Sequence, residues 1–144
     1  MRRRVLAVDD DERLRRLLRI NLQSPEIEVL EVGTGEECLR LAREGGIELI
    51  LLDLNLPDCC GWDVLAALRE SEPSRSVPVI VLSVVPPDKA MIERWRPQQY
   101  LQKPFDAREL PGHVRRVLGE AVCDTSQSDT SQSMMEGSQD EQRG

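Results

Sequence analysis

The sequence predicts a doubly wound α/β domain built on a five-stranded parallel sheet. Short apolar runs rich in β-branched residues alternate with stretches in which leucines recur every three or four residues. Residues that favour turns and helix caps separate the two kinds of segment. Strand and helix patterns that alternate five times indicate a parallel sheet with helices on both of its faces.

Each expected strand is a short run of apolar residues, and the third and fourth runs are almost continuous. A strand without polar alternation is typical of a sheet buried on both sides. The expected strands are Arg4–Val8, Glu28–Val32, Leu49–Leu52, Val79–Leu82 and Tyr100–Leu101.

The expected helices lie between these runs and have recognisable caps. The sequence Thr34-Gly35-Glu36-Glu37 is a capping-box pattern, Asp11 is suited to cap the first helix, and Asp88 is suited to cap a short fourth helix that ends before Pro97. Asp106 with Glu109 is expected to cap the fifth. The expected inner faces are Leu14, Leu17, Leu18 and Leu22 in the first helix, Cys38, Leu41 and Ala42 in the second, and Val64, Leu65 and Leu68 in the third.

The length and charge of the chain indicate one folded domain over residues 1–122 and a polar acidic tail over residues 123–144. The net charge is -7, of which -4 lies in the tail, where the unit Asp124–Ser128 is repeated as Asp129–Ser133. We expect such a composition to be disordered. Because the tail is too short to fold as an effector unit, the sequence predicts a stand-alone domain that signals by protein contact.

Several classes of function are disfavoured by composition. The chain has no basic stripe for nucleic acid, so we expect no direct DNA binding. It has no membrane-length apolar run and no signal peptide, which indicates a cytoplasmic protein. Its four cysteines lack a Cys-x-x-Cys spacing and His113 is the only histidine, which argues against a zinc site.

Polar side chains follow three of the expected strands at their carboxyl ends. Asp9 and Asp10 follow the first strand, Asp53 follows the third and Ser83 follows the fourth. Parallel strands bring their carboxyl ends to one edge, where ligands of such sheets bind. A buried serine needs a hydrogen-bond partner, and no residue next to Ser83 in the sequence offers an obvious one.

The acidic residues at this edge favour a hard cation. Clustered carboxylates repel one another, so either their pKa values rise or a cation neutralises them, and oxygen ligands suit Mg²⁺. Lys103 follows the fifth strand, and among 19 basic residues only Lys89 and Lys103 are lysine. A lysine kept in an arginine-rich chain indicates a need for a compact point charge that pairs with a carboxylate or a phosphoryl oxygen. A plain salt bridge is the alternative.

Together these segments resemble the receiver domain of two-component response regulators. The resemblance covers about residues 4–120 and rests on "VDDDE", "LILLDLNLPDCCGWDVL", "VPVIVLS" and "YLQKPF" in that order. It implies a flavodoxin-like sheet with strand order 2-1-3-4-5. It also implies a signalling switch, and not an enzyme in the usual sense, that takes part in its own phosphorylation and dephosphorylation.

The resemblance also implies a role for each residue of the site. Asp53 is then the phosphoacceptor. Mg²⁺ is bound by Asp10, Asp53 and the backbone carbonyl of Asn55, with Asp9 assisting. Ser83 hydrogen-bonds the phosphoryl group and Lys103 contacts it. Tyr100 occupies the aromatic position that turns inward when the hydroxyl moves, and the Lys103–Pro104 bond is expected to be cis. The implied partners are a sensor histidine kinase or phosphotransfer protein, and a downstream protein target.

Two departures from the family pattern concern access to Asp53 and the surface through which the domain signals. Val84 is bulkier than the usual Ala or Gly and is expected to narrow access to Asp53, and Pro86, Pro87 and Pro97 confine the fourth helix. These departures argue mildly for the alternative of a pseudo-receiver, an interaction module that is never phosphorylated, whereas the intact set of site residues argues against it.

Two other readings are weaker. Gly33-Thr34-Gly35-x-x-Cys38 is close to a dinucleotide fingerprint, but it follows the second strand and carries Glu36 and Glu37 where pyrophosphate would lie. A Mg²⁺-dependent aspartyl phosphatase would share the acidic cluster. Such enzymes use an Asp-x-Asp pattern on an early strand, which Asp53-Leu54-Asn55 lacks.

Overall fold

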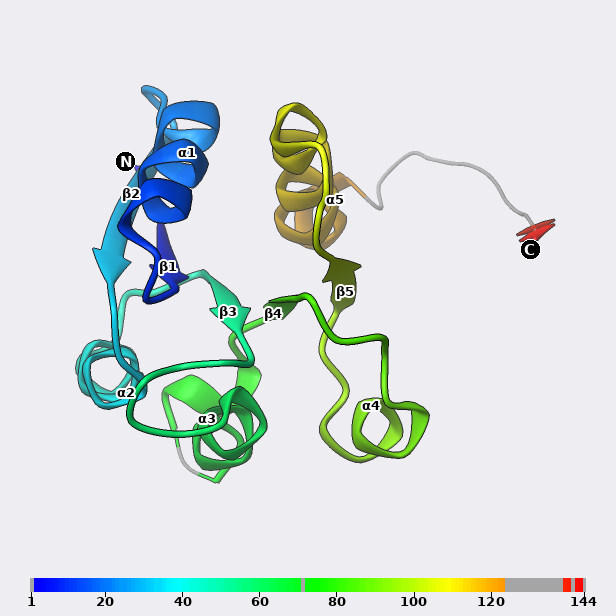
Figure 1. Cartoon of the computed structure of the whole chain (residues 1–144). Helices are drawn as coiled ribbons and strands as arrows, with labels where there is room; N and C mark the ends of the chain where they lie inside the picture. The colour runs from blue at the N-terminus through cyan, green and yellow to red at the C-terminus, as the bar shows by residue number, and fades with distance from the viewer. Residues whose placement is uncertain (1, 71, 124–138, 141, 144) are drawn as a thin grey trace. The chain divides into compact units, whose positions relative to one another are not determined.

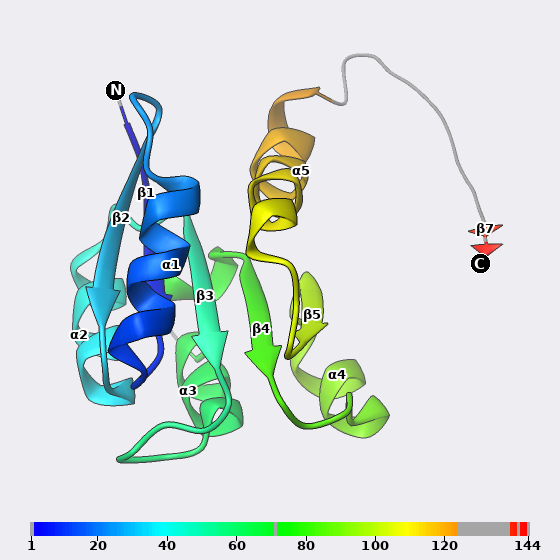
Figure 2. The same ribbon diagram turned by 45° about the horizontal axis from the view of Figure 1, so that its top comes forward.

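The five strands form one parallel sheet with the order β2-β1-β3-β4-β5. The computed structural model describes residues 2–70, 72–123, 139–140 and 142–143, and the chain divides into two units, Met1–Pro111 and Gly112–Gly144. The first unit contains the sheet (Figures 1 and 2). Its strands are β1 (Arg3–Val8), β2 (Ile27–Val32), β3 (Leu49–Asp53), β4 (Val79–Ser83) and β5 (Gln99–Gln102). The predicted fold class and strand order are therefore confirmed.

Helices cover both faces of this sheet. In Figure 1, α1 lies on one face, and α2, α3 and α4 lie on the other. The helices of the first unit are α1 (Glu12–Leu22), α2 (Gly35–Glu44), α3 (Gly61–Leu68) and α4 (Lys89–Trp95), with short 3₁₀ turns η1 (Ser74–Ser76) and η2 (Ala107–Glu109).

The core consists of the apolar strand residues and the inner faces of the helices. Every residue of β3 and of β4 is buried, as expected for continuous apolar strands inside a parallel sheet. The predicted inner faces of α2 and α3 pack into this core. In α1 the prediction was wrong for Leu17, which is 44% exposed, while Leu18 and Leu22 are buried. The apolar stripe of α1 is thus narrower than its leucine spacing suggests.

The helix caps follow the predicted residues with two differences. Asp11 and Asp88 accept the second and third amides of α1 and α4, and Thr34 accepts the amide of Glu37. The Glu37 carboxylate, however, accepts the amide of Gly33, one residue before the position that a capping box uses.

The second difference concerns the fifth helix. Asp106 caps η2, and α5 (Leu110–Cys123) begins directly after that turn. Pro111 lacks the amide hydrogen that a helix interior needs, so it is accommodated at the second position of α5, where no such bond is required.

Most of the predicted tail lies outside the described residues. Cys123, assigned to the tail, is the last residue of α5, and the two-residue strands β7 (Gln139–Asp140) and β8 (Gln142–Arg143) pair with each other. The disorder of the tail stays a prediction. Among the described residues, none of the helices has the length and apolarity needed to cross a bilayer.

Candidate phosphorylation and metal site

The sheet register brings the acidic residues to one level. Val8 of β1 pairs with Leu52 of β3, so Asp9 and Asp53, the residues that follow them, lie side by side at the carboxyl ends of the two strands. The β1–β3 pair is the point at which the strand order reverses, where ligands of such sheets bind.

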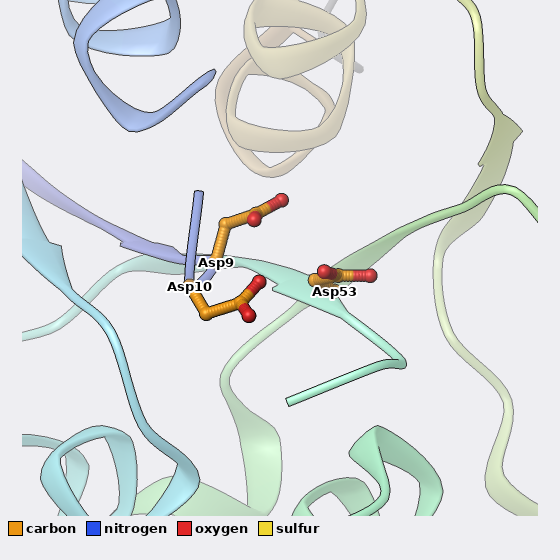
Figure 3. Close-up of side chains that lie close together, drawn as sticks. All are labelled: Asp9, Asp10 and Asp53. Carbon is orange, nitrogen blue, oxygen red and sulfur yellow. The ribbon is translucent and has the colours of Figure 1, made fainter. Parts of the chain in front are cut away.

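Three carboxylates meet at this point (Figure 3). One oxygen from each of Asp9, Asp10 and Asp53 lies within 4.8 Å of the other two. Asp9 and Asp53 are 1% and 5% exposed, while Asp10 is exposed. A cluster of oxygen donors with one side open to solvent fits a hard divalent cation that keeps part of its water shell.

Lys103 contributes the positive charge of the site. It follows β5, and its Nζ lies 2.9 Å from Asp9 Oδ2 and 3.6 Å from Asp53 Oδ2. Its backbone amide donates to the carbonyl of Ser83, and this bond fixes the start of the loop that follows β5. The Lys103–Pro104 peptide is cis, as the family resemblance implied. The expected resting pair with a carboxylate is confirmed, and Asp9 is the nearer partner.

The surroundings of Asp53 favour its neutral form. Burial raises the pKa of Asp53, and the nearby Asp9 and Asp10 raise it further, whereas the Asn55 amide and Lys103 lower it. The Asn55 amide donates to Asp53 Oδ1 at 3.2 Å. An added cation would remove the repulsion among the three acids and favour the carboxylate.

Ser83 and Tyr100 are both tied to the loop after β4. The expectation that Ser83 has no neighbouring partner was wrong, because its Oγ accepts the amide of Val85 at 3.0 Å. This bond uses a lone pair and leaves the hydroxyl proton available to donate. The Tyr100 hydroxyl donates to the carbonyl of Val85 at 2.7 Å, and its ring stacks on Trp62. Val84 is 64% exposed.

The loop between β3 and α3 is held by contacts that the sequence pattern did not reveal. Asp58 accepts the amides of Gly35 and Glu36 at 3.0 and 3.1 Å, so it caps α2 from a distant loop. These two bonds lower the pKa of Asp58. With Thr34 bound to Glu37, the first three amides of α2 are already satisfied, which argues against pyrophosphate binding at this glycine-rich turn.

Comparison with known proteins agrees with this architecture. The family model described as response regulator receiver domain matches residues 5–115. The transcriptional regulatory protein SrrA of Staphylococcus aureus is 35% identical over 120 residues, which cover 82% of this chain and 48% of SrrA. The chain thus spans about half the length of the curated relatives it matches.

Solved structures give the same picture. The chemotaxis protein CheY4 of Vibrio cholerae superposes with a TM-score of 0.75 and 28% identity, covering 82% of this chain and all of CheY4 (100%). The BeF3-activated receiver domain of DrrB, a protein of Thermotoga maritima, superposes with a TM-score of 0.71 and 28% identity, covering 82% of this chain and 98% of that domain.

The fold and its acidic edge define a class of α/β signalling domain, and the matches specify which one. The chain belongs to the response regulator receiver domain family of two-component signalling. Receiver domains accept phosphoryl groups in order to signal, and they work with histidine kinases or phosphotransfer proteins.

Proposed function

We propose that this receiver accepts a phosphoryl group on Asp53 from a phosphohistidine, and that the modification changes the surface seen by a downstream protein. The observation that carries the proposal is the convergence of Asp9, Asp10 and Asp53 within 4.8 Å, with Lys103 Nζ at 2.9 and 3.6 Å from two of them. Phosphoryl transfer requires positioning and charge neutralisation above all, and this set of residues supplies both.

The donor set supports Mg²⁺ as the cation. Asp10, Asp53 and the carbonyl of Asn55 would hold it, and Asp9 would assist. Mg²⁺ bound there would neutralise the carboxylates and the phosphoryl oxygens. Asp9 also keeps Lys103 in place, since it is the nearer partner of Nζ.

The proposed step balances as an in-line displacement. A carboxylate oxygen of Asp53 forms a bond to phosphorus, the P–N bond of the phosphohistidine breaks, and the imidazole leaves with the electron pair. Lys103 shifts toward the new phosphoryl oxygens, and the free proton of Ser83 donates to one of them. Attack of water on phosphorus later breaks the acyl-phosphate P–O bond and returns Asp53 to a carboxylate.

The proposed output passes through the loop after β4. Ser83 accepts the amide of Val85, and Tyr100 donates to the carbonyl of the same residue. A movement of Ser83 would therefore shift the backbone of Val85 and, through it, the hydrogen bond of Tyr100. Direct DNA binding is not part of the proposal. Its expected absence stays a prediction, because the matched relative is a transcriptional regulatory protein about twice as long as the matched region.

Intact-mass measurement tests the proposal. Wild type incubated with Mg²⁺ and acetyl phosphate or phosphoramidate is expected to gain one phosphoryl group, and Asp53→Asn is expected to gain none. An equal gain in the Asn variant would place the acceptor elsewhere. If neither protein is modified, the alternative of an unphosphorylated interaction module is favoured.

A further inference from the structure

Arg15 differs from the other arginines of α1 in its burial. Arg13, Arg16 and Arg19 are exposed, whereas the Arg15 side chain is 19% exposed. An arginine is withdrawn from water only where its donors find acceptors. The burial of Arg15 therefore indicates a specific structural role for this side chain.

The contacts of Arg15 lead to the acidic site. Its Nη1 donates to the backbone carbonyl of Asp9 at 2.7 Å, and its Nε lies 3.4 Å from Oε1 of Glu31 on the neighbouring strand β2. A Cβ on Gly33 would lie 3.3 Å from Nη1, so the glycine leaves space for the guanidinium. The planar guanidinium of Arg15 thus fits between β2 and the end of β1.

The carbonyl of Asp9 belongs to the peptide group that continues into Asp10. Because that group is planar, a bond that fixes the carbonyl also fixes the amide end from which Asp10 extends. The amide of Asp9 is held by the carbonyl of Val32 at 3.2 Å, on the other side of the same residue. Arg15 supplies the matching restraint on the carbonyl side.

Asp10 depends on this restraint more than its neighbours do. The Asp9 carboxylate is held by the amide of Asp11 at 2.8 Å and by Lys103 at 2.9 Å. Within the part of the chain that the structure describes, no side chain donates a hydrogen bond to the exposed Asp10 carboxylate. The position of this carboxylate therefore depends on the backbone that carries it.

We infer that Arg15 is a positioning residue for the cation site: by fixing the Asp9–Asp10 peptide it orients the Asp10 carboxylate toward Asp53. The inference rests on the proposed function, in which Asp10 is a Mg²⁺ ligand. It adds a residue of α1 that does not itself touch the cation or the phosphoryl group.

The contribution of Arg15 is geometric, because its charge is balanced by Glu31. Arg19 pairs with the same glutamate at 3.5 Å but is exposed, and within the described residues no hydrogen bond or ion pair joins it to Asp9. Arg19 is therefore a matched control. Lysine at position 15 would keep the charge, but a single ammonium on a flexible chain cannot reproduce the two directed contacts of the fork.

The test compares Mg²⁺ binding to Arg15→Gln, Arg15→Lys and Arg19→Gln by calorimetry and by tryptophan fluorescence, with thermal unfolding as the measure of folding. We expect both Arg15 variants to bind Mg²⁺ about tenfold more weakly than wild type, as is usual when a group that orients a metal ligand is lost. Arg19→Gln is expected to keep wild-type affinity. At saturating Mg²⁺ the Arg15 variants should recover phosphorylation by acetyl phosphate, because only the affinity has changed.

Three outcomes would overturn the inference. They are equal Mg²⁺ affinity in the Arg15 and Arg19 variants, wild-type affinity in Arg15→Lys, and a phosphorylation defect that persists at saturating Mg²⁺ in a folded Arg15→Lys. If Arg15→Gln fails to fold, Arg15→Lys decides the result. Wild type that binds no Mg²⁺ would overturn the proposed function as well, whereas the first three outcomes leave it standing.

Discussion

Gly61 determines how closely α3 approaches the end of β3. Its amide donates to the carbonyl of Leu54 at 2.7 Å, and a Cβ at this position would lie 2.6 Å from both the carbonyl oxygen of Asp53 and the Cα of Leu54. Both of these are backbone atoms, which cannot rotate away. The glycine is therefore required by the position of the candidate phosphoacceptor.

We predict that Gly61→Ala displaces the backbone at Asp53. Overpacking of this kind costs about 1–3 kcal/mol of unfolding free energy, and the shift should also slow phosphorylation of Asp53. Gly112→Ala is the control, because a Cβ there has no neighbour within 4 Å. In a helix that change should be neutral or stabilise by up to about 1 kcal/mol. Urea unfolding and mass-based phosphorylation rates measure both effects, and a Gly61→Ala variant with wild-type values would contradict the argument.

Lys103 is expected to be irreplaceable by arginine. Its Nζ reaches Asp9 and Asp53 together as a compact point charge. We expect the wider planar guanidinium not to fit between Asp53 and an incoming phosphoryl group. Lys103→Arg should therefore lose nearly as much phosphorylation rate as Lys103→Ala, on the order of a hundredfold.

The control for this prediction is the other lysine of the chain. Lys89 is exposed at the start of α4, so Lys89→Arg should phosphorylate like wild type. Rates are followed by intact mass in the presence of phosphoramidate. Wild-type kinetics in Lys103→Arg would mean that positive charge alone is sufficient at this position.

Among the elements, α3 begins without a side-chain cap. Cys60 occupies its N-cap position with extended backbone angles (φ -83°, ψ 139°), and no side-chain hydrogen bond is formed there. The contrast with α1, α2 and α4 is clear, since Asp11, Thr34 and Asp88 cap those helices. The helix next to the candidate site thus lacks the N-terminal cap that α1, α2 and α4 have.

We predict that Cys60→Ser stabilises the domain by about 0.5–1 kcal/mol, because a hydroxyl at this position accepts a first-turn amide of α3. Cys60→Ala is the matched control and should leave the stability unchanged, since it removes the thiol without supplying an acceptor. Chemical unfolding of the two variants under reducing conditions measures the difference. Equal stability of the Ser and Ala variants would show that the position gains nothing from a cap.

At the scale of the whole first unit, the sheet brings several acidic groups together at one edge, and their negative charge lowers the stability of the fold. Burial and two neighbouring acids raise the pKa of Asp53 above its ordinary value of 3.8. A raised carboxyl pKa means that the unfolded state ionises more readily, so the ionised group costs stability at neutral pH. That cost declines as the pH falls through the raised folded value, and it is absent below the ordinary value.

Asp53→Asn should therefore be more stable than wild type at about pH 7 without Mg²⁺, and the difference should shrink toward about pH 4. Saturating Mg²⁺ should reduce or reverse the difference, because it stabilises the form that binds it. Thermal unfolding across this pH range, with and without Mg²⁺, makes the comparison. A difference that is unchanged by pH would show that ionisation of Asp53 is not its cause.

The sequence by itself determined the fold class, the order of the elements and the acids at the edge of the sheet. These features are encoded locally: apolar runs define the strands, and Asp11, Thr34 and Asp88 mark helix starts by chemistry confined to one turn. The family resemblance then supplied the strand order and the roles that are expected of the site residues.

Only the tertiary structure decided which of these groups touch. Lys103 meets Asp9, 94 positions away in the chain, and Asp58 caps α2 across 23 positions. The pairing of Arg15 with both Asp9 and Glu31 depends on the space that Gly33 leaves. Such contacts arise from strand register and close packing. Both bring together residues that are far apart in the sequence, so the local sequence around one residue does not predict its partner.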